Sequence, residues 1–108
     1  MKRKGIAIAM FDAPDTQAFL DWAHGKHMSD CGKVPSVKRV RRHEVFEGPP
    51  DRRRWLSITE YDELDAALAF RDSEQGRATR QDADNQGVSN RYVLVCREIF
   101  DTAAPEKK

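Results

Sequence analysis

The order in which strand-like and helix-like segments follow one another constrains the fold of this chain most. Short apolar or alternating segments bounded by Gly, Pro and Asp indicate strands. Apolar residues spaced three and four apart indicate helices. The expected strands cover residues 5–11, 37–47, 54–61 and 88–100, and the expected helices cover residues 16–30 and a segment that begins at Asp62 or Glu63. The order is therefore βαββαβ.

This order predicts an α+β, ferredoxin-like domain, in which a four-stranded antiparallel sheet carries both helices on one face. The other face is left bare, so we expect a second copy to cover it. Composition supports this expectation, because 39% hydrophobic residues and a mean hydropathy of −0.78 give a single small domain a thin core. Residues 1–100 are expected to form the single domain, and residues 101–108 a disordered tail.

Local signals predict where the elements begin and end. Asp15 is the expected N-cap of the first helix, and Gly32 is expected just after its end. The polar stretch Asp72–Gln86 is consistent either with a short helix or with an irregular excursion. In the third strand, Leu56 and Ile58 are expected on one face, with Trp55, Ser57 and Thr59 on the other.

Charge and motif content exclude several classes of function. Nineteen Lys and Arg against 18 Asp and Glu give a net charge of +1, so electrostatics favour neither nucleic acid nor an anionic membrane. The longest apolar run, residues 6–11, is too short for a membrane span or a signal peptide. No glycine-rich phosphate loop or nucleophile elbow occurs, so no cofactor is expected. Cys31 and Cys96 form no disulfide framework, which favours reduced thiols and a cytoplasmic location.

Several segments together resemble a known superfamily. Within Trp22–Asp30, the sequence His27-Met28-Ser29-Asp30 resembles the His-Met-x-Asp signature of the dimeric α+β barrel superfamily, in particular its EthD-like members. The resemblance covers residues 5–100. Val34–Val37 stands in the place of the family's Pro-Gly-Val motif, and Lys38–Arg42 resembles its basic second strand. Leu56–Tyr61 resembles the third strand, although Thr59 stands where the family often has tyrosine. Ser73–Ala78 resembles the extension of the second helix.

The resemblance implies a homodimer whose two sheets pack together, with a ligand pocket near the gap between the first helix and the sheet. It also implies a cofactor-independent enzyme that uses histidine acid–base catalysis on a small aromatic, phenolic, lactone or polyketide-like substrate, as a lyase, isomerase or cyclase. The alternatives are a non-catalytic dimer that binds a small ligand, a cofactor-free monooxygenase, or a haem-handling protein with His24 or His27 as axial ligand.

His27 is the first catalytic candidate, because imidazole is the natural general acid or base near neutral pH. Its spacing from Phe19 and Ala23 turns it toward the sheet, where it could equally be a structural histidine bound to a carbonyl. His24 shares that side of the helix and could assist. With Cys31, the two histidines could bind a metal, but no third-strand ligand is evident, so no metal is expected.

The second strand supplies the remaining polar candidates. His43 alternates with Arg41, whereas Arg42 lies on the opposite face. Either arginine could hold a carboxylate or phenolate, or could instead form a solvated or subunit-bridging ion pair. Among the aromatic residues, Trp22 and Tyr61 are expected to shape the pocket and Trp55 to pack in the core. Cys96 is expected to be an inert buried thiol.

Overall fold

The computed structural model describes residues 3–50 and 53–103. The expected tail is therefore covered only for residues 101–103, and the remainder of that prediction, residues 104–108, lies outside the described residues. Within the described ranges, none of the helices combines the length and apolar character that a membrane crossing needs.

A four-stranded antiparallel sheet forms one layer of the molecule. Its strands are β1 (Gly5–Asp12), β2 (Val37–Glu44), β3 (Trp55–Tyr61) and β4 (Ser89–Arg97), in the order β2-β3-β1-β4. Because β1 and β3 are the central strands and β3 follows β2 through a hairpin, the topology is ferredoxin-like, as the sequence predicts.

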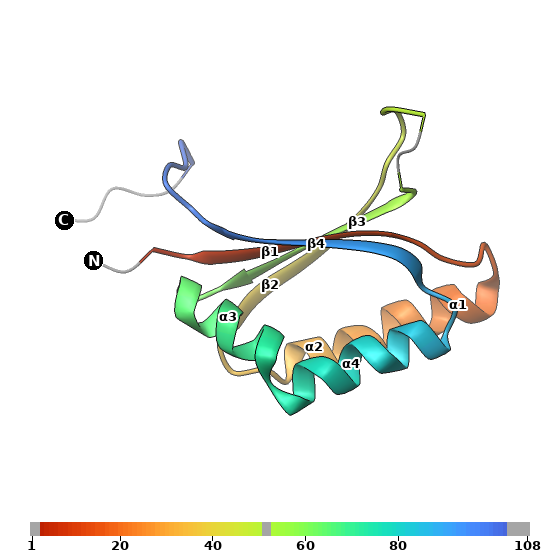
Figure 1. Ribbon diagram of the computed structural model, residues 1–108, viewed down its shortest axis with the longest axis horizontal. Helices are drawn as coiled ribbons and strands as arrows, with labels where there is room; N and C mark the ends of the chain where they lie inside the picture. The colour runs from red at the N-terminus through yellow and green to blue at the C-terminus, as the bar shows by residue number, and fades with distance from the viewer. Residues whose placement is uncertain (1–2, 51–52, 104–108) are drawn as a thin grey trace.

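The helices form the second layer and all lie on one face of the sheet, while the opposite face carries no element of the domain (Figure 1). The first helical stretch consists of α1 (Gln17–Trp22), a π-helical segment η1 (Ala23–His27) and α2 (Met28–Gly32). The second consists of α3 (Leu64–Asp72) and α4 (Glu74–Asn85). The polar stretch after Asp72 is thus a helix and not an irregular excursion.

Several predicted boundaries are wrong by a few residues. The N-cap of α1 is Thr16, whose hydroxyl accepts a hydrogen bond from the Phe19 N–H at 3.1 Å. Asp15 instead forms an ion pair with Arg54 at 3.2 Å, across to the β2–β3 hairpin. Helix α2 includes Gly32 and is capped by Lys33. Strands β2 and β4 end three residues earlier than expected, and Phe46, Ile99 and Phe100 beyond their ends are exposed.

A tight corner joins α3 to α4 and explains the glycine in the polar stretch. Ser73 caps α4 by accepting a hydrogen bond from the Gly76 N–H at 2.9 Å. This geometry holds Gly76 against the main-chain carbonyl of Phe70, where a Cβ atom would collide with the oxygen. Glycine is therefore required for α4 to pack directly behind α3.

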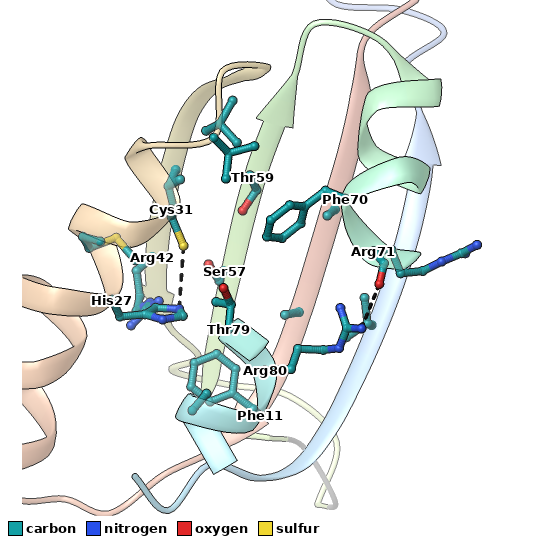
Figure 2. A pocket seen from close by; sticks show the side chains of 18 of the residues that line it. Phe11, His27, Cys31, Arg42, Ser57, Thr59, Phe70, Arg71, Thr79 and Arg80 are labelled. Atoms are coloured by element: carbon teal, nitrogen blue, oxygen red, sulfur yellow. Dashed lines mark hydrogen bonds between the residues drawn. The ribbon is translucent and has the colours of Figure 1, made fainter. Parts of the chain in front are cut away.

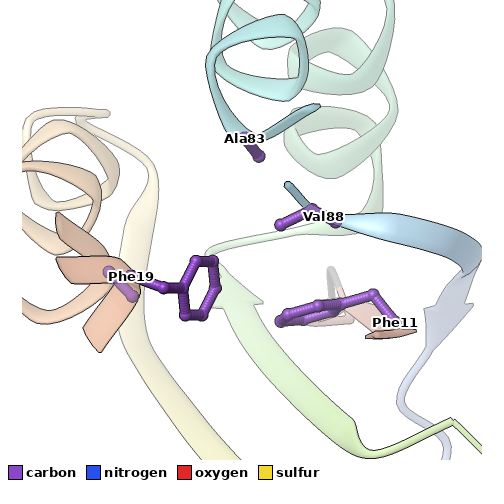
Figure 3. Close-up of a cluster of buried hydrophobic side chains, with 5 residues drawn as sticks. Phe11, Phe19, Ala83 and Val88 are labelled. Atoms are coloured by element: carbon purple, nitrogen blue, oxygen red, sulfur yellow. The ribbon is translucent and has the colours of Figure 1, made fainter. Parts of the chain in front are cut away.

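The densest core lies where α1 and the end of α4 meet the sheet. Figure 3 shows Phe11 and Phe19 facing one another beside Ala83 and Val88, and Ala23 completes the cluster. Trp55 packs against this cluster, as expected. The prediction that Cys96 is buried is wrong, because its side chain is only half-buried. It alternates with Val95 and lies on the open face of the sheet.

Candidate functional site

A cavity of about 160 Å³ lies between the sheet and the helices. The helix-facing positions of the central strand β1 include Ala7 and Ala9, while the larger Ile6 and Ile8 alternate onto the open face. Small side chains at the middle of the sheet leave room that a conventional core would fill. Figure 2 shows side chains from β2, β3, η1, α2, α3 and α4 around this space, and Phe19 and Trp22 of α1 also line it.

Filling the cavity from its floor is expected to abolish ligand binding without unfolding the protein. In Ala7→Leu, the added carbons would occupy the space beside β1, and cavity filling typically stabilises a fold by about 1 kcal/mol. Urea denaturation and ligand titration by NMR would measure both effects. Ala69→Leu, the same change on an exposed position of α3, should leave ligand binding intact. Undiminished binding by Ala7→Leu would place the ligand site elsewhere.

His27 lies at the end of η1 and points into the cavity. Its ring stacks on Trp22, with centroids 4.7 Å apart. The Trp22 indole N–H donates to the Asp82 carboxylate on α4 at 3.3 Å, and Lys26 pairs with the same oxygen at 2.9 Å. The imidazole is therefore held by a chain of contacts that spans both helical stretches. No main-chain carbonyl among the described residues accepts a hydrogen bond from this ring.

The environment keeps the His27 ring neutral. Burial and, to a smaller extent, the positive charge of Arg42 together lower its pKa from 6.5 to about 4. Both causes disfavour the imidazolium. At neutral pH the ring therefore has a free nitrogen lone pair, which is the form that a general base requires.

The lowered pKa also predicts a pH dependence of stability. The unfolded chain binds a proton at His27 below about pH 6.5, whereas the folded protein resists protonation until about pH 4. The stabilising contribution is thus complete above pH 6.5 and is lost as the pH falls through 4. Allowing for partial exposure of the ring, it amounts to about 2 kcal/mol. Urea titrations from pH 7.5 to 4 should show this loss of stability in the unmodified protein, and His27→Gln should lack it. Free energies of unfolding that fall equally with pH in both proteins would contradict the prediction.

Arg42 is an unpaired cation in the cavity wall. Its guanidinium lies 5.6 Å from the centroid of the Phe11 ring, and its Nε atom is buried with no hydrogen-bond acceptor among the described residues. No carboxylate in the described part of the chain forms an ion pair with it, and burial lowers its pKa. A buried N–H without an acceptor is costly, so the site is suited to an anionic or strongly accepting ligand atom.

Hydroxyl and thiol groups complete this end of the cavity. The Cys31 Sγ atom lies 3.9 Å from His27 Nε2, and burial raises the pKa of the thiol, which is therefore protonated. Tyr61 is 4% exposed and belongs to the cavity wall. Burial raises its pKa to about 12. Ser57 and Thr59 line the same wall, so neutral donors surround Arg42 and His27.

Of the residues predicted to form the site, the structure brings four together and separates three. His27, Trp22, Arg42 and Tyr61 line the cavity. The three others lie outside it: His24 is exposed on η1, while His43 and Arg41 lie on the open face of the sheet, where Arg41 pairs with Glu60 at 3.3 Å. In the described part of the chain, no three metal-binding side chains converge.

Sequence reasoning missed the opposite end of the cavity, which is lined by Phe70, Arg71, Arg80 and Arg91. The signal in α4 is weak, because only the small residues Gly76 and Ala83, with Arg80 between them, recur at helical spacing on the packed side of the helix. The Trp22–His27 stack had no such signal. Residues five apart diverge in an α-helix, and they meet here because of the π-helical segment.

Comparison with known proteins supports the fold. No family model and no curated protein matches the sequence. An EthD family protein from Bacillus halodurans superposes with a TM-score of 0.68 at 17% identity, covering 89% of this chain and 99% of the other. A hydroxynitrile lyase from Passiflora edulis gives a TM-score of 0.65 at 14% identity, covering 97% and 100%. A cofactor-independent oxygenase from Streptomyces nogalater gives a TM-score of 0.67 at 8% identity, covering 94% and 99%.

Other matched structures are described as dimeric ferredoxin-like proteins of unknown function. At these identities the matches establish the fold. The chain thus has a ferredoxin-like fold, and the resemblance to EthD-like proteins is confirmed at the level of the fold.

Proposed function

We propose that the protein is a cofactor-independent enzyme in which His27 removes a proton from a small substrate and Arg42 stabilises the oxyanion that results. The observation that carries this proposal is the juxtaposition of a neutral imidazole and an unpaired, buried guanidinium in one apolar cavity. General bases and preorganised charges are the two groups that such chemistry requires.

The size of the cavity restricts the substrate to roughly one ring. An engineered apolar cavity of about 150 Å³ holds benzene, and the present cavity of about 160 Å³ is similar. Of the expected substrate classes, small aromatic, phenolic and lactone compounds fit directly. A multi-ring polyketide would require the helices to move away from the sheet.

The reaction proceeds in two balanced steps. His27 accepts a proton from carbon or hydroxyl, and the electron pair of the broken bond moves onto an oxygen or a leaving group beside Arg42. The imidazolium formed next to Arg42 is unfavourable on its own, but the new negative charge between the two cations offsets the repulsion. Return of the proton to another carbon gives isomerisation; in the lyase reaction a carbonyl forms as the bond to the leaving group breaks, and the departing anion takes the proton from His27. The lyase and the oxygenase among the structural matches support cofactor-free chemistry on this fold.

Proton transfer can be tested before the natural substrate is known. Phenylacetone and α-angelica lactone carry exchangeable C–H groups on a ring-sized frame, and mandelonitrile tests cleavage. Incubation with the protein in D₂O should accelerate exchange or cleavage above the buffer rate, as followed by proton NMR. Rates equal to buffer for all three compounds, with binding observed, would support a non-catalytic binding protein instead. The low pKa of His27 favours that second candidate, because it makes the ring a weak base until an anion binds.

We also propose that a second copy covers the open face of the sheet. This face carries an apolar strip across three strands, in which Tyr92 is 49% and Leu94 39% exposed, beside Ile8 and Ile58. The dimeric descriptions of matched structures support this assignment. Two identical strips can pack on one another about a twofold axis.

A charge placed in this strip is expected to prevent dimer formation. Leu94→Lys would bury an unpaired ammonium at the interface, so the protein should elute at 12.4 kDa, whereas the unmodified chain should elute at twice that mass. Size-exclusion chromatography with light scattering measures this directly. Ala78→Lys, on the exposed side of α4, is the matched control and should remain dimeric. A monomeric unmodified chain would exclude the homodimer.

A further inference from the structure

We propose that Arg80 forms a second anion-binding subsite at the far end of the cavity, so that the preferred ligand is a single ring with anionic groups at opposite ends. This inference rests on the cavity of the proposed function and specifies its substrate class. It concerns a residue of α4 that the proton-transfer step does not use.

Three arginines line that end of the cavity, and two of them already have acidic partners. Arg71 pairs with Asp72 at 2.9 Å, and Arg91 pairs with Asp84 at 2.7 Å. The half-buried Arg80 forms no ion pair with a carboxylate of the described residues. Its Nη2 atom donates instead to the main-chain carbonyl of Arg71 at 2.8 Å. That bond fixes the side chain. The Asp72 carboxylate, which is already paired with Arg71, interacts with Arg80 at longer range.

The two guanidinium groups that form no ion pair with a described carboxylate, Arg42 and Arg80, lie on opposite sides of the cavity. Figure 2 shows Arg42 beside β2, next to His27 and Cys31, and Arg80 across the space, below Phe70 and joined to the main-chain carbonyl of Arg71. Between them the Phe70 ring projects into the space and Ala7 lies on the floor, while Ser57 and Thr79 add hydroxyl groups to the walls. An apolar ring fits that middle section, while a charged group at each end meets a cation.

Electrostatics favour a ligand with two charges over one with a single charge. Two positive charges facing one low-dielectric cavity raise each other's energy. A monoanion compensates only one of them, whereas a dianion of matching length compensates both and can accept charge-assisted hydrogen bonds at each end. The cavity volume excludes long acyl chains, so the second anion must be attached to the ring or close to it.

Terephthalate, benzoate and phthalate test this arrangement by isothermal titration calorimetry. Terephthalate has carboxylates at opposite ends of one ring, and its symmetry removes any ambiguity of orientation. Phthalate has the same charge and composition with adjacent carboxylates, and benzoate has one carboxylate. We expect terephthalate to bind about tenfold more tightly than either of the others. Equal Kd values for terephthalate and phthalate would show a diffuse positive field and would overturn the subsite.

Arg80→Gln is expected to weaken terephthalate binding about tenfold and benzoate binding less than about threefold, because Arg42 remains. Arg77→Gln removes a charge from the exposed side of the same helix and should change neither Kd. An unchanged terephthalate affinity in Arg80→Gln, or no binding of any probe, would also overturn the subsite. The proton-transfer proposal stands or falls separately, since exchange in D₂O uses uncharged compounds.

Discussion

Replacing His27 with glutamine is expected to lower protein-catalysed proton exchange by about 100-fold or more, which is the usual contribution of a positioned general base. Glutamine is close to imidazole in size and remains neutral, so the stack on Trp22 and the cavity should persist. The measurement is the rate of deuterium incorporation into phenylacetone or α-angelica lactone, whichever the unmodified protein accelerates more. His24→Gln, an exposed histidine three residues earlier, should retain the full rate.

The pH profile separates a catalytic His27 from one that merely supports the fold. In the free enzyme the base is active when deprotonated, so kcat/KM should stay level from neutral pH down to about 5. It should fall near pH 4 rather than near the ordinary histidine value of 6.5. An acid limb near 6.5, or a normal rate in His27→Gln, would assign proton transfer to another group.

The fold could be predicted from the sequence because its strands and helices differ in hydrophobic period. Alternation placed Leu56 and Ile58 on one face of β3 and Trp55, Ser57 and Thr59 on the other, and the register of the sheet confirms it. Helical spacing likewise turned His27 toward the sheet. The N-cap was misplaced by one residue because Asp15 and Thr16 are both good capping residues, and the choice depends on the ion pair with Arg54.

The candidate site was harder to predict, because it depends on which face of each strand the helices cover. The alternation of side chains along β2 puts Arg42 on one face and Arg41 and His43 on the other. Because both faces carry charged residues, the sequence offers no reason to choose which face the helices cover. The structure puts Arg42 under the helices and leaves His43 in the open. Arg80 was missed for a different reason: the apolar signal of α4 consists only of small residues, which is too weak to fix a helical phase.

Arg42→Met is expected to separate activity from stability. Methionine retains much of the aliphatic packing but removes the positive charge that faces His27 in the cavity wall, so kcat/KM for proton transfer should fall by about 100-fold to 1,000-fold, as for the loss of an oxyanion-stabilising group. The free energy of unfolding should stay equal or rise, because the cavity no longer contains a buried cation without a partner. Since the positive charge of Arg42 also lowers the pKa of His27, the acid limb should move upward from about pH 4.

The neighbouring arginine provides the control. Arg41→Met removes a charge from the open face, where the side chain pairs with Glu60, and should leave proton transfer within a few-fold of normal. Urea denaturation and deuterium exchange on both variants distinguish an arginine that stabilises an oxyanion from one that supports the fold. If Arg42→Met were destabilised and still active, the guanidinium would be a structural group satisfied within the fold, and the oxyanion role would be lost. Lower activity with undiminished stability would instead identify a charge that the protein maintains for its ligand.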